Sequence, residues 1–351
     1  MLVLHVVESL DLRPGAVVIS LDGIVAPLAA MGIQSRIVAE GEPGKVQQHG
    51  DARDARPLDV EHVLGQVDIV HIHAWGYGFA DRVARAAIQL RKPLVLSPHG
   101  ALCAGPYDRE GWLDRLRRRW RQRRLIRAVR VVTALNKHEE TAVSRAHSSV
   151  RLLPYGLAFD DYRMGADASA NPGERWIVML GSLHPRGGCV ALLKALAEVG
   201  PEANGWNLAL VGADDGQWRR MLEPAVRRKG GEERVRFDAG AIVDAQREWL
   251  SRASLVAAPS LQPTFPLSIM QALAAGVPVL ASNLASPPGL DGLIRVCGPR
   301  RDELREALRA VLARPDKARR DSAKAAVSAA RMALDWSVLA PRWSELYREL
   351  I

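Results

Sequence analysis

Four of the nine histidines stand within or beside apolar runs that have the length of buried strands. His5 lies inside the first run, His71 and His73 alternate near the end of another, and His99 follows a third run and precedes Gly100. A neutral imidazole donates and accepts a hydrogen bond and titrates near pH 7, so it can serve proton transfer. We expect His5 to be a hydrogen-bonded core residue and His71 and His73 to be structural. His99 stands on a loop, where a histidine either contacts a ligand or has no chemical role.

The turn at Gly15 and Ala16 follows the first apolar run and precedes a helical pattern. A strand that passes through a turn into a helix presents backbone N–H groups and a helix N-terminus together, and such places bind anions. Gly15 and Ala16 are therefore candidates for close approach of the backbone to a phosphate or an acceptor. A simple strand–helix turn is the alternative.

The cysteines do not have the spacing of a metal site or a disulfide framework. Cys103, Cys189 and Cys297 lie far apart in the chain, with no paired spacing. Zinc sites and disulfide scaffolds both need closely spaced pairs or an even set of cysteines. We expect three separate buried thiols and no metal.

Much of the positive charge is concentrated in one segment. The net charge is +9 and the pI is about 9.9, but no helix-turn-helix, zinc-finger or RNA-recognition signature accompanies it, so we expect no nucleic-acid partner. From Asp114 to Arg130 the chain is rich in arginine, and Leu113, Leu116 and Trp120 form an apolar stripe at helical spacing. The pattern is typical of an interfacial helix on an anionic membrane, or of an amphipathic surface helix packed on a sheet. The candidate membrane or acceptor residues are Trp112, Arg117, Arg118, Trp120 and Arg121.

Short apolar runs that alternate with helical patterns must position these residues. Continuous rather than alternating apolar strands, each followed by a helix, indicate a parallel sheet covered on both faces. The expected strands of the first half are Leu2–Val7, Ser35–Ala39, Asp68–His73, Pro93–Ser97, Val129–Ala134 and Val150–Pro154. Helices are expected at Ile19–Met31 and Phe79–Gln89.

The same alternation restarts after a polar break at Gly156–Arg175, which has the composition of a linker. The expected second-half strands are Trp176–Leu180, Asn207–Val211, Val235–Phe237, Leu255–Ala258 and Pro278–Ala281. The expected helices are Val190–Val199, Gln217–Lys229, Ala245–Ser251, Ile269–Ala275, Arg301–Ala313 and Asp316–Ala333. A chain of 351 residues exceeds the usual size of one domain. The sequence therefore predicts two doubly wound α/β domains whose strand ends face each other across a cleft.

No run of apolar residues is long enough for a membrane-spanning helix, and the first residues have neither the basic region nor the cleavage site of a signal peptide. We expect a cytoplasmic protein, in contact with the inner membrane face through the basic segment.

The segment Pro259–Ser282, with the sequence PSLQPTFPLSIMQALAAGVPVLAS, resembles the donor-binding signature of the retaining group 1 (family 4) glycosyltransferases. The resemblance extends along nearly the whole chain. Further similar segments follow in the family's order at Ser9–Ala16, Asp68–Trp75, Ser97–Leu102, Leu153–Leu157, Gly181–Gly188 and Leu334–Leu350. The resemblance implies the GT-B fold, with two Rossmann-like domains at residues 1–165 and 166–333 and a closing helix at 334–351 that returns to the first domain.

By this resemblance, the second domain binds a nucleotide sugar as substrate, and neither a metal nor another cofactor is implied. Gly181 begins the diphosphate loop, in which the family has an arginine and a lysine. Here Ser182 and Gly187 occupy those positions, and Arg186 is the basic residue that remains nearby. Loss of both charges would remove several kcal/mol of transition-state stabilisation, on the order of that from strong charged contacts.

The family signature also has two glutamates, and both are replaced. Pro263 stands at the first position, which faces the sugar, and Gln271 stands at the second, which binds the ribose. A glutamine still forms hydrogen bonds with hydroxyl groups, so Gln271 can retain part of this role. The other residues that the resemblance places at the donor are Gln262, Phe265 and Leu267.

His99 is the catalytic candidate, because the resemblance places it against the donor sugar or beside the acceptor. The first interpretation is an enzyme that transfers a sugar, with retention, from a nucleotide diphosphate to a cell-surface polysaccharide or glycolipid acceptor. The replacements at Ser182, Gly187, Pro263 and Gln271 leave a second interpretation open. In it, the chain is an inactive homologue that acts as partner or scaffold for an active transferase.

Overall fold

The computed structural model describes residues 1–7, 16–40, 46–48, 51–56, 59–73, 78–103, 125–162, 174–181, 183–212, 217–227, 233–239, 243–261, 267–290, 292–298 and 300–351. Two compact units divide the chain. The first contains Met1–Gly156 together with Trp336–Ile351, and the second contains Leu157–Asp335. The sequence places these boundaries after residue 165 and after residue 333.

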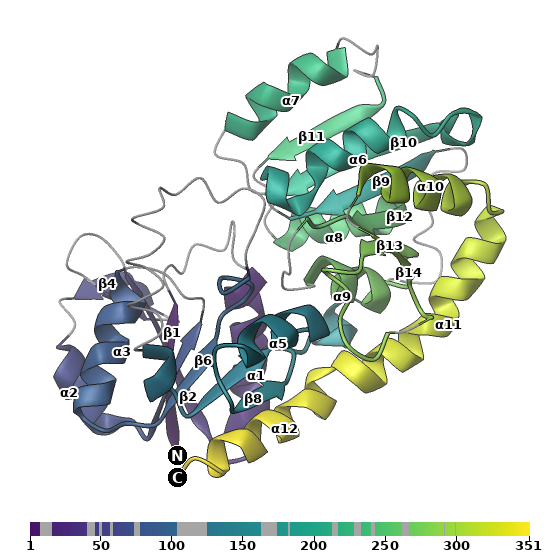
Figure 1. The fold of residues 1–351 in the computed structure, drawn as a ribbon. Coiled ribbons are helices and arrows are strands. Elements are labelled where there is room, and N and C mark those ends of the chain that lie inside the picture. The colour runs from purple at the N-terminus through teal and green to yellow at the C-terminus, as the bar shows by residue number, and fades with distance from the viewer. Residues whose placement is uncertain are drawn as a thin grey trace. The chain divides into compact units, whose positions relative to one another are not determined.

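The first unit is built on an eight-stranded sheet with the order β4-β3-β2-β1-β5-β6-β7-β8 (Figure 1). Its strands are β1 (Leu2–Val7), β2 (Gln34–Glu40), β3 (Val46–Gln48), β4 (Asp51–Arg56), β5 (Ile69–His73), β6 (Leu94–Ser97), β7 (Val131–Ala134) and β8 (Val150–Leu152). Six neighbouring strands of this sheet are parallel to one another: β2, β1, β5, β6, β7 and β8. The antiparallel pair β3–β4 at the edge was not expected, because its residues, VQQ and DARDAR, contain no apolar run.

The helices of the first unit are α1 (Ala16–Ala30), α2 (Val60–Gln66), α3 (Phe79–Gln89), α5 (Lys137–Ser144) and α12 (Trp336–Arg348). Helix α12 packs against α1, at a place where Gly23 leaves room for the Trp336 ring. A Cβ on Gly23 would stand 2.4 Å from Trp336 Nε1. The C-terminal helix is therefore part of the first unit, as the resemblance implies.

The second unit has a six-stranded, all-parallel sheet in the order β11-β10-β9-β12-β13-β14 (Figure 1). Its strands are β9 (Arg175–Leu180), β10 (Trp206–Gly212), β11 (Val235–Ala239), β12 (Ala253–Ala258), β13 (Val279–Ser282) and β14 (Arg295–Cys297). Its helices are α6 (Cys189–Leu196), α7 (Gln217–Arg227), α8 (Val243–Arg252), α9 (Leu267–Ala274), α10 (Arg301–Leu312) and α11 (Asp316–Leu334), with 3₁₀ turns η1 (Phe159–Tyr162), η2 (Pro185–Gly187) and η3 (Pro201–Ala203). Both sheets confirm the expected doubly wound α/β architecture.

The first and last residues of the second unit are joined to each other. The Leu157 amide donates to the Leu334 carbonyl at 2.9 Å, and Arg331 forms an ion pair with Asp160 at 2.6 Å. The two passages of the chain between the units therefore lie side by side. None of the helices that the structure describes is long and apolar enough to cross a membrane.

Candidate active site

Four histidines and two tyrosines form a polar cluster in the first unit, and all of them are buried except His99, which is half-buried. His5 and His71 are paired in register on the neighbouring strands β1 and β5, and His73 ends β5. Parallel strands present their carboxyl ends at one edge of the sheet, where ligands bind in open α/β folds. His73 and His99 both lie at this edge, and their rings are stacked with centroids 5.7 Å apart.

A continuous series of hydrogen bonds connects the cluster to α12. Tyr347 Oη lies 2.8 Å from His71 Nδ1, and His71 Nε2 lies 2.8 Å from Ser97 Oγ. Ser97 also contacts Thr133 Oγ1 and, at 3.2 Å, Tyr155 Oη. Tyr155 Oη lies 2.9 Å from His73 Nδ1, and His73 Nε2 lies 2.9 Å from His5 Nδ1.

One assignment of protons satisfies every donor in this series. If each imidazole is neutral, His5 Nδ1 donates to His73, His73 Nδ1 donates to Tyr155, and Tyr155 donates to Ser97. From the other side Tyr347 donates to His71, and His71 Nε2 donates to Ser97. Ser97 then donates to Thr133, and Thr133 donates to the Leu96 carbonyl. His5 Nε2, which has no partner among the described residues, carries no proton in this assignment. His5 was expected to be a hydrogen-bonded core residue. Its Nδ1 is hydrogen-bonded, but its Nε2 is not bonded to any described residue.

Burial keeps the histidines neutral. Desolvation lowers the pKa of His5 and of His99 from 6.5 to about 3. It also lowers the pKa of His71 and His73 well below 6.5, with a further decrease from the neighbouring imidazoles. Burial raises the pKa of Tyr155 and Tyr347 well above 10, so both hydroxyls keep their protons. The cluster is therefore a network of neutral groups near pH 7.

The nitrogens of His5, His71 and His73 all lie within 4.8 Å of one another, which is close enough for three ligands of one metal ion. The hydrogen bonds above already use at least one nitrogen of each ring, and the partners described for these rings are other imidazoles and hydroxyl groups. Both ring nitrogens of His71 and both of His73 are used in these hydrogen bonds, so neither ring has a nitrogen left for a metal ion. We therefore interpret the group as a hydrogen-bonded network.

Replacing Ser97 with alanine is expected to lower the free energy of unfolding of the first unit by about 2–4 kcal/mol, because two buried donors, His71 Nε2 and Tyr155 Oη, lose their acceptor. Urea unfolding followed by hydrogen exchange of β5 and β6 measures this loss. Ser344→Ala, at a buried serine of α12, is the matched control and should change stability by less than about 1 kcal/mol. Equal losses in the two variants would contradict the proton assignment.

His99 stands in an unusual turn directly after β6. Its φ is +50°, and Gly100 follows with φ +82°, so two successive residues have left-handed backbone conformation. The His99 ring is stacked on Tyr155, with centroids 5.5 Å apart and an angle of 18° between the rings. The Gly100 amide donates to Glu139 Oε1 at 2.6 Å. Contacts therefore hold both the imidazole ring of His99 and the backbone of the turn that carries it.

In the second unit, the loop after β9 is packed backbone to backbone against its neighbours. Gly181 has φ +126°, and no described atom lies within 4 Å of where its Cβ would be. A Cβ on Gly212, at the end of β10, would stand 1.8 Å from the Gly181 carbonyl oxygen. A Cβ on Gly188, with φ +89°, would stand 2.1 Å from the Pro259 carbonyl oxygen. A Cβ at Gly188 or Gly212 would therefore meet backbone atoms, and the positive φ of Gly181 also favours glycine.

Arg186, the remaining basic residue of this loop, lies in η2. His184 Nδ1 accepts a hydrogen bond from the Arg186 amide, and the Leu261 amide donates to the Arg186 carbonyl at 2.9 Å. The side chain of Arg186 is half-buried. Helix α6 begins directly after this turn, so its N-terminal amides and the guanidinium are contributed by one short stretch of chain.

Gln271 of α9 is buried and takes part in internal hydrogen bonds. Its amide nitrogen donates to Tyr162 Oη at 3.1 Å and to Gln246 Oε1 at 3.3 Å. The Arg247 guanidinium lies 5.1 Å from the centre of the Tyr162 ring. Leu267, the first residue of the same helix, is also buried. The sequence contains no signal that connects Tyr162 or Gln246 with Gln271, since the contacts join separate elements.

Several sequence candidates lie outside the described residues. These are Gly15, Ser182, Gln262, Phe265, Trp112, Arg117, Arg118, Trp120 and Arg121. Ala16 is the first residue of α1, which agrees with a turn before this helix. The roles of all these residues stay predictions.

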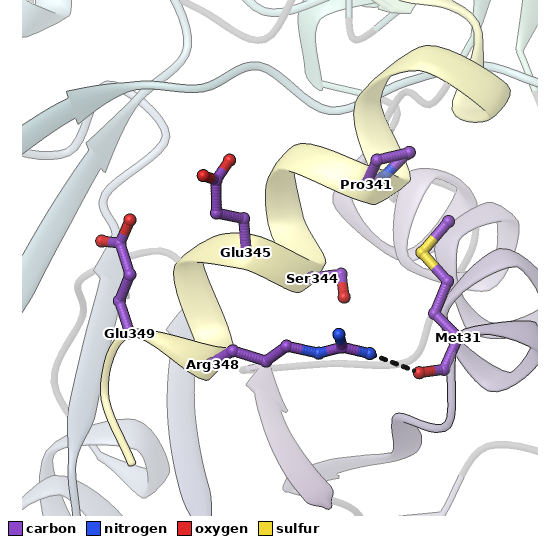
Figure 2. Close-up of a pocket in the computed structure, with 6 residues that line it drawn as sticks. All are labelled: Met31, Pro341, Ser344, Glu345, Arg348 and Glu349. Carbon is purple, nitrogen blue, oxygen red and sulfur yellow. Dashed lines mark hydrogen bonds between the residues drawn. The ribbon is translucent and has the colours of Figure 1, made fainter.

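A cavity of about 570 Å³ lies elsewhere in the first unit. Figure 2 shows residues that line it, among them Glu345 and Arg348 of α12 and Glu349 directly after this helix; Arg348 donates to the Met31 carbonyl at 2.8 Å. Met31 follows α1 and precedes β2, so the cavity is at the amino-terminal edge of the sheet. His99 is at the opposite edge, and the cavity is therefore separate from the candidate site.

Comparison with known proteins matches each unit to a glycosyltransferase family model. Glycosyltransferase Family 4 matches residues 17–157, and Glycosyl transferases group 1 matches residues 174–314. The chain belongs to the group 1 (family 4) glycosyltransferases. Glycosyltransferase is accordingly its enzyme class, and its two α/β units are those of the GT-B fold.

The chain is similar along most of its length to three known proteins. A GDP-mannose:cellobiosyl-diphosphopolyprenol alpha-mannosyltransferase of Komagataeibacter xylinus is 23% identical over 334 residues, 89% of this chain and 82% of that protein. The structure of sucrose-phosphate synthase from Thermosynechococcus elongatus has a TM-score of 0.76 at 19% identity, and covers 100% of this chain and 99% of its own. The structure of Anabaena HepE in complex with UDP and glucose has a TM-score of 0.75 at 19% identity, with 100% of both chains covered. At these identities the two structures show the fold.

Proposed function

We propose that this group 1 glycosyltransferase moves a hexose-type sugar from a nucleotide diphosphate to a polysaccharide or glycolipid acceptor at the cytoplasmic face of the membrane, with retention at the anomeric carbon. Family membership supports glycosyl transfer. The Komagataeibacter relative is named for GDP-mannose and cellobiosyl-diphosphopolyprenol, and HepE was solved with UDP and glucose. These names support the classes of donor and acceptor.

The glycine-rich turn between β9 and α6 is the feature that carries the proposal. In the transfer, an acceptor hydroxyl oxygen forms a bond to the anomeric carbon and releases its proton. The bond between that carbon and a phosphate oxygen breaks, and the leaving nucleoside diphosphate gains negative charge. Backbone amides, a helix N-terminus and a basic side chain stabilise such a charge. The turn before α6 contains all three kinds of group, and Arg186 is its positively charged side chain. The close packing of Gly181, Gly188 and Gly212 makes this surface rigid.

Binding of nucleotide diphosphates tests the proposal directly. Calorimetric titration of the protein with UDP, GDP and ADP, and with their glucose and mannose conjugates, should reveal selective binding of one nucleotide family. Arg186→Ala should weaken that binding about 10- to 100-fold, because a hydrogen bond to a charged group contributes about 1.5–3 kcal/mol. Arg234→Ala is the matched control, because Arg234 is exposed and immediately precedes β11, at the opposite edge of the same sheet.

The arrangement around Gln271 favours the second interpretation, a partner or scaffold without catalysis. The side chain is buried and its amide nitrogen already donates to Tyr162 and Gln246, so it has no further donor to offer a nucleotide ribose. If the folded protein binds no nucleotide of the panel, the transferase proposal is wrong. Capture of an active transferase as a stable complex would then support the scaffold.

A further inference from the structure

We propose that Glu139 is a positioning residue for His99, because its buried carboxylate fixes the backbone of the turn that presents the imidazole. The inference rests on the proposed function for its effect on catalysis. Its structural effect, the placement of the His99 ring, can be measured without any substrate.

The Glu139 carboxylate joins two loops at the carboxyl edge of the first sheet. Oε1 accepts the Gly100 amide at 2.6 Å, in the loop after β6. Oε2 accepts the Leu135 amide at 2.8 Å, in the loop after β7. Glu139 itself is fixed, because Asn136 caps α5 by accepting the Glu139 amide at 2.9 Å. Both carboxylate oxygens are therefore used to hold backbone.

The turn needs such support. A non-glycine residue in left-handed conformation costs about 1–2 kcal/mol, and it persists where the surroundings determine it. His99 is in this conformation. The turn contains two further backbone bonds, from Ala101 to the Pro98 carbonyl at 2.9 Å and from Cys103 to the Gly100 carbonyl at 3.0 Å. Stacking on Tyr155 and His73 orients the ring, but the position of the backbone depends on Glu139.

Burial of the Glu139 carboxylate costs free energy of desolvation. Glu139 is 1% exposed, and desolvation raises its pKa, an effect that the amides of Leu135 and Gly100 oppose. No lysine or arginine is paired with it in the part of the chain that the structure describes. Burial of a carboxylate costs free energy unless hydrogen bonds compensate it. Here the compensating bonds come from the two loops, and one of them fixes the turn at His99.

Glu139→Gln tests the inference with nearly the same shape. A glutamine has one acceptor oxygen, so its NH2 group would face one of the two backbone donors, and one loop would be released. In ¹⁵N-histidine-labelled protein, the ring resonances then report each imidazole. We expect the pKa of His99 to rise from about 3 toward 6.5, as its ring leaves Tyr155. His5 and His71 should remain unprotonated, because neither contacts the turn.

Glu140→Gln is the matched control on the same helix, and it should leave the His99 resonances unchanged. Glu139→Asp keeps the charge but is one methylene shorter, so an intermediate shift is expected. If neither Glu139→Gln nor Glu139→Asp changes the His99 resonances, the inference is wrong. Protonation of all four histidines together would also overturn it, since Glu139 would then support the unit and not the turn. If Glu139→Gln does not fold, the aspartate variant decides by the same resonances.

A kinetic comparison separates this inference from the proposed function. With the nucleotide sugar that calorimetry identifies, Glu139→Gln should lower kcat about 100-fold, as expected for a displaced catalytic group. The nucleotide affinity should stay within about threefold, because the donor loop is in the second unit. A loss of affinity with unchanged kcat would contradict positioning. If no nucleotide binds, the proposed function fails, and the histidine resonances still test the turn.

Discussion

Gly212→Ala is expected to abolish stable folding of the second unit or to lower its free energy of unfolding by more than about 3 kcal/mol, a loss typical of overpacking combined with backbone strain. The added methyl carbon would stand 1.8 Å from the Gly181 carbonyl oxygen and 2.6 Å from its carbonyl carbon, and both are backbone atoms of β9 and its loop. Neither can rotate away as a side chain would. Urea unfolding followed by hydrogen exchange of β9, β10 and β12 measures the effect, and nucleotide binding should be lost in parallel.

Gly205→Ala is the matched control for the backbone strain alone. Gly205 also has a positive φ, +75°, in the same unit, but no described atom lies within 4 Å of its Cβ position. It should cost about 1 kcal/mol, the penalty for a left-handed alanine. Similar losses for the two variants would mean that the contact of Gly212 with Gly181 can relax, and that the loop is not the rigid surface that we propose.

Acidification is expected to unfold the first unit before the second. An unfolded histidine has a pKa near 6.5, whereas burial lowers the folded pKa of His5 and His99 to about 3 and those of His71 and His73 well below 6.5. The unfolded chain then binds more protons than the folded one between these values. The stability is therefore fully present above about pH 6.5 and is lost as the pH falls toward 3; for His5 and His99 the loss is about 2 kcal/mol each at pH 5.

Other titrating groups of the cluster do not cancel this effect. Tyr155 and Tyr347 have raised pKa values and stay protonated over the whole range. Glu139 has a raised pKa, so its contribution to stability increases as the pH falls. This opposes the effect of the histidines, but it comes from one group, whereas four imidazoles act in the other direction. Urea midpoints at pH 7.5 and 5.0, with hydrogen exchange of β1 and β5 compared with β9 and β10, measure the loss in each unit.

His5→Leu should reduce the pH dependence by about a quarter, because it removes one of the four titrating imidazoles. His62→Asn is the control, because His62 is exposed on α2 and lies outside the cluster. Loss of protection in both units at the same pH would contradict the prediction, as would an unchanged pH dependence in His5→Leu.

The architecture could be predicted from the sequence because continuous apolar strands and helical periodicity are local patterns. Strand β1 was expected at the residues where it is found, and most other strands within a few residues. The short helices α2 and α5 and the strands β3, β4 and β14 were not expected. In β3 and β4 the polar composition gives no strand signal, and pairing with β2 in the tertiary structure decides their conformation.

Residues of the candidate site could be predicted from the sequence only where they directly follow a strand and match a position of the family motif. Gly181, Arg186 and His99 follow strands, and their places after β9 and β6 agree with the motif positions. Glu139 was missed because it reads as an ordinary residue of a helical first turn. Its role depends on Gly100, which approaches it from a different loop.

Local patterns alone therefore account for the order of the elements, the loops that carry polar residues and the family resemblance. Contacts between distant residues account for the rest. His71 and Tyr347 are 276 positions apart, and Gln271 meets Tyr162 across 109 positions. The lowered pKa values of the histidines depend on burial by the whole unit, because exclusion of water disfavours the charged imidazole. Hydrogen bonding and desolvation are properties of the packed chain, which is why the folded structure decided which polar residues are held together at His99.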